Sequence, residues 1–203
     1  MWTLAERNEL SQAESVAREV IEEAKQLRAL NIESSGWNIR GDIAKFRGDY
    51  TQARGFYQKA VELAYRTASR KSIVIELNRT MVEVADRDFQ AAHDTLERLD
   101  DRLHAAGMPM YSPFVSIGRA ATAVSRGEWE QWRDEIAEFE SVLDEHGVIQ
   151  RDLAWFAEVT AEITAECGDA SQGEEMFEIA RTLWRELGDE SAVARLDERL
   201  AAI

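Results

Sequence analysis

One type of segment recurs along the chain about every 40 residues, and this repeat limits the possible folds more than any other feature. The clearest copy reads GDYTQARGFYQKA from residue 48. Related segments are NELSQAESVAREV from residue 8, RDFQAAHDTLERL from 87, GEWEQWRDEIAEF from 127 and GDASQGEEMFEIA from 168. Corresponding positions lie 40, 39, 40 and 41 residues apart: Ala13, Ala53, Ala92, Trp132 and Gly173. A constant period of this length is typical of stacked structural units.

Each copy has the pattern of a helix that follows a tight turn. After Gly48, the residues Ala53, Tyr57 and Ala60 follow at intervals of three and four, which places them on one helical face. A second helical pattern, such as SIVIELNRTMVEVA, lies between successive copies. The sequence therefore predicts an all-α chain, a right-handed α-solenoid of antiparallel helix pairs with about ten helices. We expect helices at 10–29, 35–47, 50–68, 71–86, 89–106, 112–126, 129–146, 150–167, 170–187 and 190–202.

The repeat also predicts how the chain is organised. We expect one array over residues 1–203, with left-handed glycines at Gly107, Gly147 and Gly188 ending helices. Its units are a partial one at about 1–33, then 34–70, 71–109, 110–149 and 150–188, followed by a C-terminal capping helix at 189–203. The partial unit has three interpretations: a chain cut from a longer protein, an end that a partner covers, or a short natural start.

One unit resembles the tetratricopeptide repeat. The match consists of Trp37, Gly41, Gly48, Tyr50, Ala53, Tyr57 and Ala60 at the spacings of that family. Arg40 and Ala44 depart from it, and the period of about 40 exceeds the usual 34. The resemblance is therefore to a long-period variant with lengthened helices, or to the longer helical-repeat families. It implies that Tyr57 fills the space beside Gly41 on the neighbouring helix. Trp132, at a position that is small in other units, should splay its helix pair or force its neighbours to rearrange.

The charge of the chain excludes several kinds of partner. It has 39 acidic and 24 basic residues, a formal net charge of -15, which argues against nucleic acid and against an anionic membrane surface. No apolar run reaches the length of a membrane span, and the first ten residues do not resemble a signal peptide. We therefore expect a cytoplasmic protein. Its single cysteine, Cys167, has no partner for an internal disulfide.

No residue pattern indicates catalysis or a cofactor. His93, His104 and His146 lack a metal-binding arrangement and are interpreted as surface or packing residues. The segment from Asp86 to Glu97 has some calcium-loop offsets, but Ala91 replaces the necessary glycine. We expect no enzyme activity, no cofactor and no metal. An enzyme that uses acids in a groove is the least favoured alternative.

The resemblance implies that the first helix of each unit lines a concave surface. The partner-binding residues expected there change from polar to apolar to acidic: Asn38, Asp42, Val74, Leu77, Met81, Phe114, Ile117, Trp155, Glu158 and Glu162. This pattern predicts a protein or peptide partner with an apolar or amphipathic segment and basic residues near the acids. The alternative is that runs such as SIVIEL are apolar because they belong to the core.

We therefore expect a non-catalytic scaffold that binds a peptide or helix of a partner protein on its concave face. The alternative is a C-terminal sensory or regulatory array of a larger signalling protein, such as a kinase or an ATPase-type transcription activator in bacteria. Self-association through the first helix is a further expectation, since its apolar face has no preceding helix to cover it. That face contains Leu10, Ala13, Val16, Val20 and Ile21.

Overall fold

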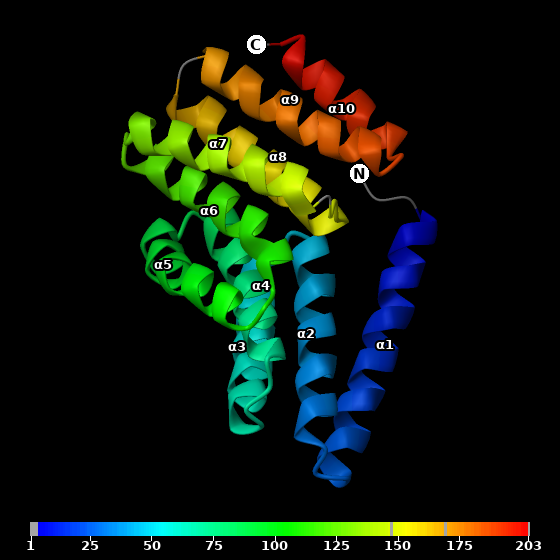
Figure 1. Cartoon of the computed structure of the whole chain (residues 1–203). Helices are drawn as coiled ribbons and strands as arrows, with labels where there is room; N and C mark the ends of the chain where they lie inside the picture. The colour runs from blue at the N-terminus through cyan, green and yellow to red at the C-terminus, as the bar shows by residue number, and fades with distance from the viewer. Residues whose placement is uncertain (1–3, 147, 169, 203) are drawn as a thin grey trace. The chain divides into compact units, whose positions relative to one another are not determined.

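The computed structural model describes residues 4–146, 148–168 and 170–202, and every regular element in these ranges is helical (Figure 1). This confirms the predicted all-α class, with ten α-helices among the described residues. They are α1 Leu4–Gln26, α2 Leu30–Phe46, α3 Tyr50–Arg66, α4 Lys71–Ala85, α5 Phe89–Ala105, α6 Ser112–Ser125, α7 Trp129–His146, α8 Arg151–Cys167, α9 Ala170–Glu186 and α10 Glu190–Leu200. A short 3-10 helix, η1, covers Pro109–Tyr111.

The helices begin where the sequence predicts, with two exceptions. Helix α1 begins at Leu4 rather than at residue 10, and α2 begins at Leu30 rather than at 35. The first turns of α2 contain serine and glycine, which are weak helix formers, and tertiary contacts explain their place in the helix. The Ser34 hydroxyl donates to the Ala60 carbonyl at 2.8 Å, and a Cβ on Gly36 would lie 2.6 Å from Ile21 Cγ1. Packing on α1 and α3 therefore outweighs the weak local preference for a helix.

Left-handed residues end seven of the described helices, and those from Arg28 to Gly127 recur about every 20 residues. They are Arg28, Gly48, Ala68, Arg87, Gly107, Gly127 and Gly188, with φ between 49° and 75°. The predicted breaks at Gly107 and Gly188 are confirmed, whereas Gly147 lies outside the described residues. Several following helices have an aspartate N-cap: Asp49, Asp88 and Asp189 accept hydrogen bonds from the backbone N–H groups of Gln52, Ala91 and Ala192. Each repeat of about 40 residues thus consists of two helices, each followed by its own turn.

The helices pack in adjacent pairs, as in a helical solenoid, and they form two compact units. Unit 1 is Met1–Asp86, where α1 packs on α2, α2 on α3 and α3 on α4, and where α2 also contacts α4. Unit 2 is Arg87–Ile203, where α6 contacts α5, α7 and α8, and where α9 packs on α8 and α10 on α9. The expected repeat at 71–109 therefore has its first helix in unit 1 and its second in unit 2.

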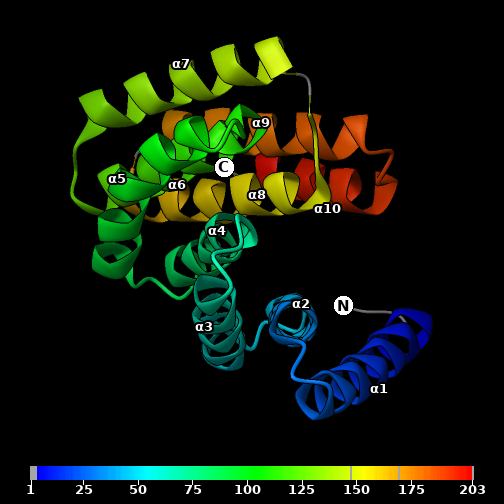
Figure 2. The same ribbon diagram turned by 60° about the horizontal axis from the view of Figure 1, so that its bottom comes forward.

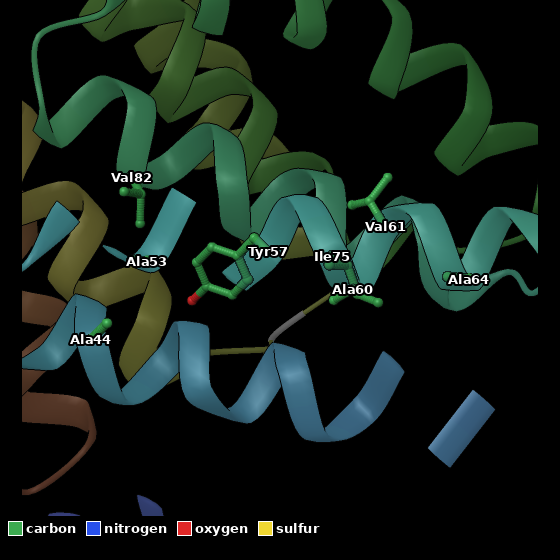
Figure 3. Packing of buried hydrophobic residues seen from close by; sticks show 8 residues of the cluster. All are labelled: Ala44, Ala53, Tyr57, Ala60, Val61, Ala64, Ile75 and Val82. Atoms are coloured by element: carbon green, nitrogen blue, oxygen red, sulfur yellow. The ribbon is translucent and has the colours of Figure 1, made fainter. Parts of the chain in front are cut away.

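The core of unit 1 is built around Tyr57 of α3 (Figure 3). This ring is fully buried, and it lies against α2 at Gly41, where a Cβ would be only 2.4 Å from the ring. Small residues on α3 allow the close approach of the helices, and Ile75 and Val82 of α4 belong to the same cluster. The packing role that the sequence assigns to the pair of Gly41 and Tyr57 is confirmed.

Unit 2 has helix α6 at its centre (Figure 2). Gly118 of α6 allows close packing, because a Cβ there would lie 3.0 Å from Leu96 of α5 and 3.3 Å from Phe156 of α8. On α7, Trp132 occupies the position that is small in other units. It is only 1% exposed, and its ring lies 6.2 Å from that of Trp129 in an edge-on arrangement. The bulky side chain is thus accommodated within the core of the unit.

Candidate partner-binding surfaces

The two polar residues predicted in unit 1, Asn38 and Asp42, belong to one hydrogen-bonded chain that joins three helices. The Tyr57 hydroxyl donates to Asp42 Oδ1 at 2.7 Å, and Asn38 Nδ2 donates to Asp42 Oδ2 at 3.1 Å. Asn78 of α4 donates to Asn38 Oδ1 at 3.2 Å. Both predicted residues therefore have partners within the unit, and their polar atoms help to align α2, α3 and α4.

The apolar residues predicted at the centre of the groove are almost completely buried. Leu77, Met81, Phe114 and Ile117 are between 0% and 2% exposed, and Val74 is half-buried. A partner cannot reach such side chains without a rearrangement of the helices. The structure thus corrects the expectation of an apolar surface at these residues, because their hydrophobicity serves the packing of longer helices. The alternative interpretation of SIVIEL as core describes this segment better.

Of the acidic residues predicted in unit 2, Glu158 already binds a basic residue of the same chain. Arg195 of α10 donates to both carboxylate oxygens of Glu158, at 2.8 and 2.9 Å, and Trp184 Nε1 of α9 donates to it at 3.0 Å. Two-point contacts between arginine and carboxylate are among the stronger ion pairs in proteins. Glu158 therefore holds α8, α9 and α10 together, and its charge is compensated without a partner.

The neighbouring acid, Glu162, lies half-buried one helical turn further along α8. Burial raises the pKa of its carboxyl group, and the negative charge of Glu158 raises that pKa further. Glu166, on the following turn, pairs with Arg87 at 2.8 Å. Trp155, the remaining predicted residue, is half-buried and its ring lies 6.4 Å from that of Phe156.

The predicted residues do not form a single surface. Asn38, Asp42, Val74, Leu77 and Met81 belong to unit 1, whereas Phe114, Ile117, Trp155, Glu158 and Glu162 belong to unit 2. Within unit 2, the structure brings together only the acids of α8, and these face basic residues of the same unit.

A surface groove that the sequence did not indicate lies between α7 and α9 of unit 2. It has a volume of about 640 Å³ and is open to solvent. Its apolar lining comes from one pair of residues on each helix, Phe139 and Leu143 on α7 and Ile179 and Leu183 on α9. The remaining lining residues are Glu140, Asp144, Glu175, Glu178 and Thr182.

The packing of unit 2 explains the groove. Helix α7 is attached to α6, helix α9 is attached to α8, and α6 and α8 contact each other. In the described part of the chain, the backbones of α7 and α9 do not approach one another closely. The side chains that face this gap are Phe139 and Leu183, which are nearly buried, and Leu143 and Ile179, which are half-buried. Leu143 and Ile179 are therefore the apolar side chains of the groove that a partner can reach, whereas Phe139 and Leu183 belong to the core of the unit.

The rim of the groove is acidic. Glu140, Asp144 and Glu175 are exposed, and no ion pair involves them within the described ranges. Glu178 pairs with Arg181, which also contacts Asp197 of α10 at 2.9 Å.

The sequence contains a weak signal of this groove. Its apolar residues are four positions apart on each helix, but this spacing alone does not distinguish an open groove from a packed interface. The gap between α7 and α9 in the structure is what shows that Leu143 and Ile179 stay accessible to solvent.

Residues with catalytic or metal-binding potential lie apart from one another. In the part of the chain that the structure describes, no three His, Cys, Asp or Glu residues form a possible metal site. His104 is exposed and contacts the Asp100 carbonyl, and Cys167 is exposed. The side chain of His146 lies outside the described residues. None of the described helices is both long enough and apolar enough to cross a bilayer.

Comparison of the sequence with protein-family models and with curated proteins finds no match. The tetratricopeptide resemblance therefore stays a prediction that depends on the residues around Trp37 and Gly48.

Proposed function

We propose that this protein is a non-catalytic scaffold of tetratricopeptide type that binds a segment of a partner protein. The groove between α7 and α9 is the observation that supports this function best. Its apolar floor, of which Leu143 and Ile179 are accessible, lies next to a polar rim. The two helices that form the groove are held in place by other helices, α7 by α6 and α9 by α8. Surfaces of this kind suit a partner segment with one apolar face.

The site proposed here differs from the concave face expected from the resemblance. The polar residues of that face, Asn38 and Asp42, bond to one another and to Tyr57, and its apolar residues are buried. The α7/α9 groove, in contrast, leaves half-buried apolar side chains next to exposed carboxylates. Binding there requires no rearrangement of the described helices.

Site-specific photo-crosslinking in the native cells tests this proposal. A photoreactive phenylalanine analogue replaces Thr182, an exposed residue of the groove, or Glu174, an exposed residue of α9 that does not line it. We expect a discrete adduct with a second protein from position 182 and none from position 174. The same adduct from both positions, or no adduct from position 182, would contradict a partner-binding groove.

A further inference from the structure

We infer that the α7/α9 groove binds a basic amphipathic helix, whose apolar face contacts the floor while its lysines and arginines lie over the acidic rim. This inference depends on the proposed function and specifies the chemistry of the partner. It follows from the direction of the apolar rows, from the shortage of hydrogen-bonding groups on the floor, and from the charges at the rim.

The apolar rows run along the helices. Phe139 and Leu143 are four residues apart on α7, and Ile179 and Leu183 are four residues apart on α9. Residues at this spacing lie above one another on one helical face, so each row follows its helix axis. A third helix that lies between the two rows places its own side chains, at intervals of three and four, against Leu143 and Ile179, the half-buried residue of each row. The volume of about 640 Å³ accommodates several such side chains.

A helix fits this floor better than an extended peptide. An extended segment needs hydrogen-bond partners for its backbone, which partner proteins normally supply from the edge of a β-sheet. The described residues contain no β-strand, and the floor offers only the apolar side chains of α7 and α9. A helix bonds its own backbone groups internally, so it can lie on an apolar floor without leaving buried polar groups unpaired.

The rim selects a basic partner. Glu140 and Asp144 on one side and Glu175 on the other are exposed carboxylates, and none of them has an ion pair among the described residues. Glu178 contributes a fourth carboxylate, which it shares with Arg181. Basic side chains above these residues would find opposite charges on both sides of the groove.

The same charges disfavour a second copy of this chain as the occupant. The chain carries a net charge of -15, so two copies repel each other. A helix of the second copy that could enter the groove is α1, whose Val16 is 58% exposed. That helix contains six acidic and three basic residues, and its charge therefore opposes docking beside an acidic rim.

Fluorescence anisotropy with a model peptide tests the inference on the full chain. The probe is an amphipathic peptide of about 18 residues, or five helical turns, that contains only leucine and lysine. Two comparison peptides have glutamate in place of lysine, or the same composition in an order without an apolar face. We expect the amphipathic lysine peptide to bind at least about tenfold more tightly than either comparison peptide.

A pair of charge-matched protein variants locates the binding. The double variant Glu140→Gln with Glu175→Gln removes two rim carboxylates, whereas Glu138→Gln with Glu174→Gln removes two exposed carboxylates from the same helices outside the groove. We expect the rim variant to bind the lysine peptide about tenfold more weakly than the control variant, since two charge pairs contribute roughly this factor. Circular dichroism checks that both variants keep their helices.

The possible outcomes are distinct. Equal loss of affinity in both variants means attraction to a negatively charged protein in general, and it overturns the inference. Equal binding of the glutamate peptide, or no binding of the lysine peptide, overturns the basic character of the partner. A photo-crosslink from position 182 would in that case still support the scaffold function. Dimers of the free protein that disappear with Ile179→Asp, seen by analytical ultracentrifugation, would make a second copy the occupant and overturn the inference.

Discussion

Gly41 shows how a single residue determines the packing of two helices. It lies on α2 opposite the fully buried ring of Tyr57, whose hydroxyl is also held by Asp42. The ring cannot turn away without breaking this hydrogen bond or entering the packed cluster of α3 and α4. The absence of a side chain at position 41 is therefore a requirement of the packing.

We predict that Gly41→Ala destabilises the protein by about 1–3 kcal/mol, because the added Cβ overpacks the core. The clash distance of 2.4 Å to the Tyr57 ring demands a shift of α2 or α3. The measurement is the midpoint of urea unfolding followed by circular dichroism. The control is Gly55→Ala on the open side of α3, where no atom lies within 4 Å, and it should stabilise by about 0.5–1 kcal/mol. Equal effects of the two substitutions would contradict this account.

Glu135 is a second residue whose surroundings determine its properties. The pKa of this carboxyl group on α7 is raised to about 7, chiefly by burial. Glu97 and Asp100 of α5 contribute to this rise, whereas the Arg119 guanidinium and a hydrogen bond with Gln131 oppose it. The folded state thus favours the protonated form, and the stability that this provides is lost as the pH rises through about 7.

We predict that Glu135→Gln raises the melting temperature at pH 8 and has little effect at pH 5. The neutral amide mimics the protonated acid, so it removes the cost of a partly buried negative charge. Because solvent screens a half-buried group, the gain at pH 8 is about 1 kcal/mol, or roughly 2–4 °C. Glu138→Gln, an exposed change on the same helix, is the control. A gain at pH 5 as large as that at pH 8 would show that the charge of Glu135 is not responsible.

At the scale of the helix and its turn, the left-handed position recurs but the residue type changes. Glycine occupies this position at Gly48, Gly107, Gly127 and Gly188, whereas Ala68 adopts it with φ of 49°. A side chain with a Cβ costs free energy in this region of backbone conformation. The turn after α3 is therefore less favourable than the turn after α2, although both continue the same repeat.

We predict that Ala68→Gly stabilises the protein by about 0.5–1 kcal/mol, because relief of backbone strain exceeds the added flexibility of the unfolded chain. The reverse change, Gly48→Ala, should destabilise by about 1 kcal/mol, since it introduces the same strain. No atom lies within 4 Å of the Cβ position at Gly48, so its effect is one of backbone conformation only. Thermal unfolding by calorimetry measures both variants. If Ala68→Gly lowers the melting temperature, strain at this turn is not significant.

At the scale of the whole molecule, the exposed apolar residues favour self-association, whereas the net negative charge opposes self-association and favours a basic partner. The most exposed of the large apolar side chains in unit 1 are Val16, Leu27 and Ile32, each more than half exposed. They allow the self-association expected from the first helix, but the net charge of -15 opposes it. The acidic groove of unit 2 has no such conflict, because a basic partner is attracted by the whole molecule as well as by the rim.

The sequence predicted more of the fold than of the candidate site. Helix positions follow from the spacing of residues such as Ala53, Tyr57 and Ala60, because local periodicity and turn residues determine them. The prediction that Leu77 and Ile117 bind a partner required knowing which face of each helix is exposed. Neighbours distant in the sequence determine the exposed face, and both side chains are buried.

The sequence by itself determined the all-α class and the positions of most helices among the described residues, because both depend on local preferences and on a regular repeat. The contact of Tyr57 with Gly41 was implied by the tetratricopeptide resemblance and is present in the structure. Only the tertiary structure decided that Glu158 is held by Arg195, that Asp42 is held by Tyr57, and that α7 and α9 leave a groove between them. An amphipathic helix has the same sequence pattern whether its apolar face is packed or open, so accessibility is decided by where the neighbouring helices lie.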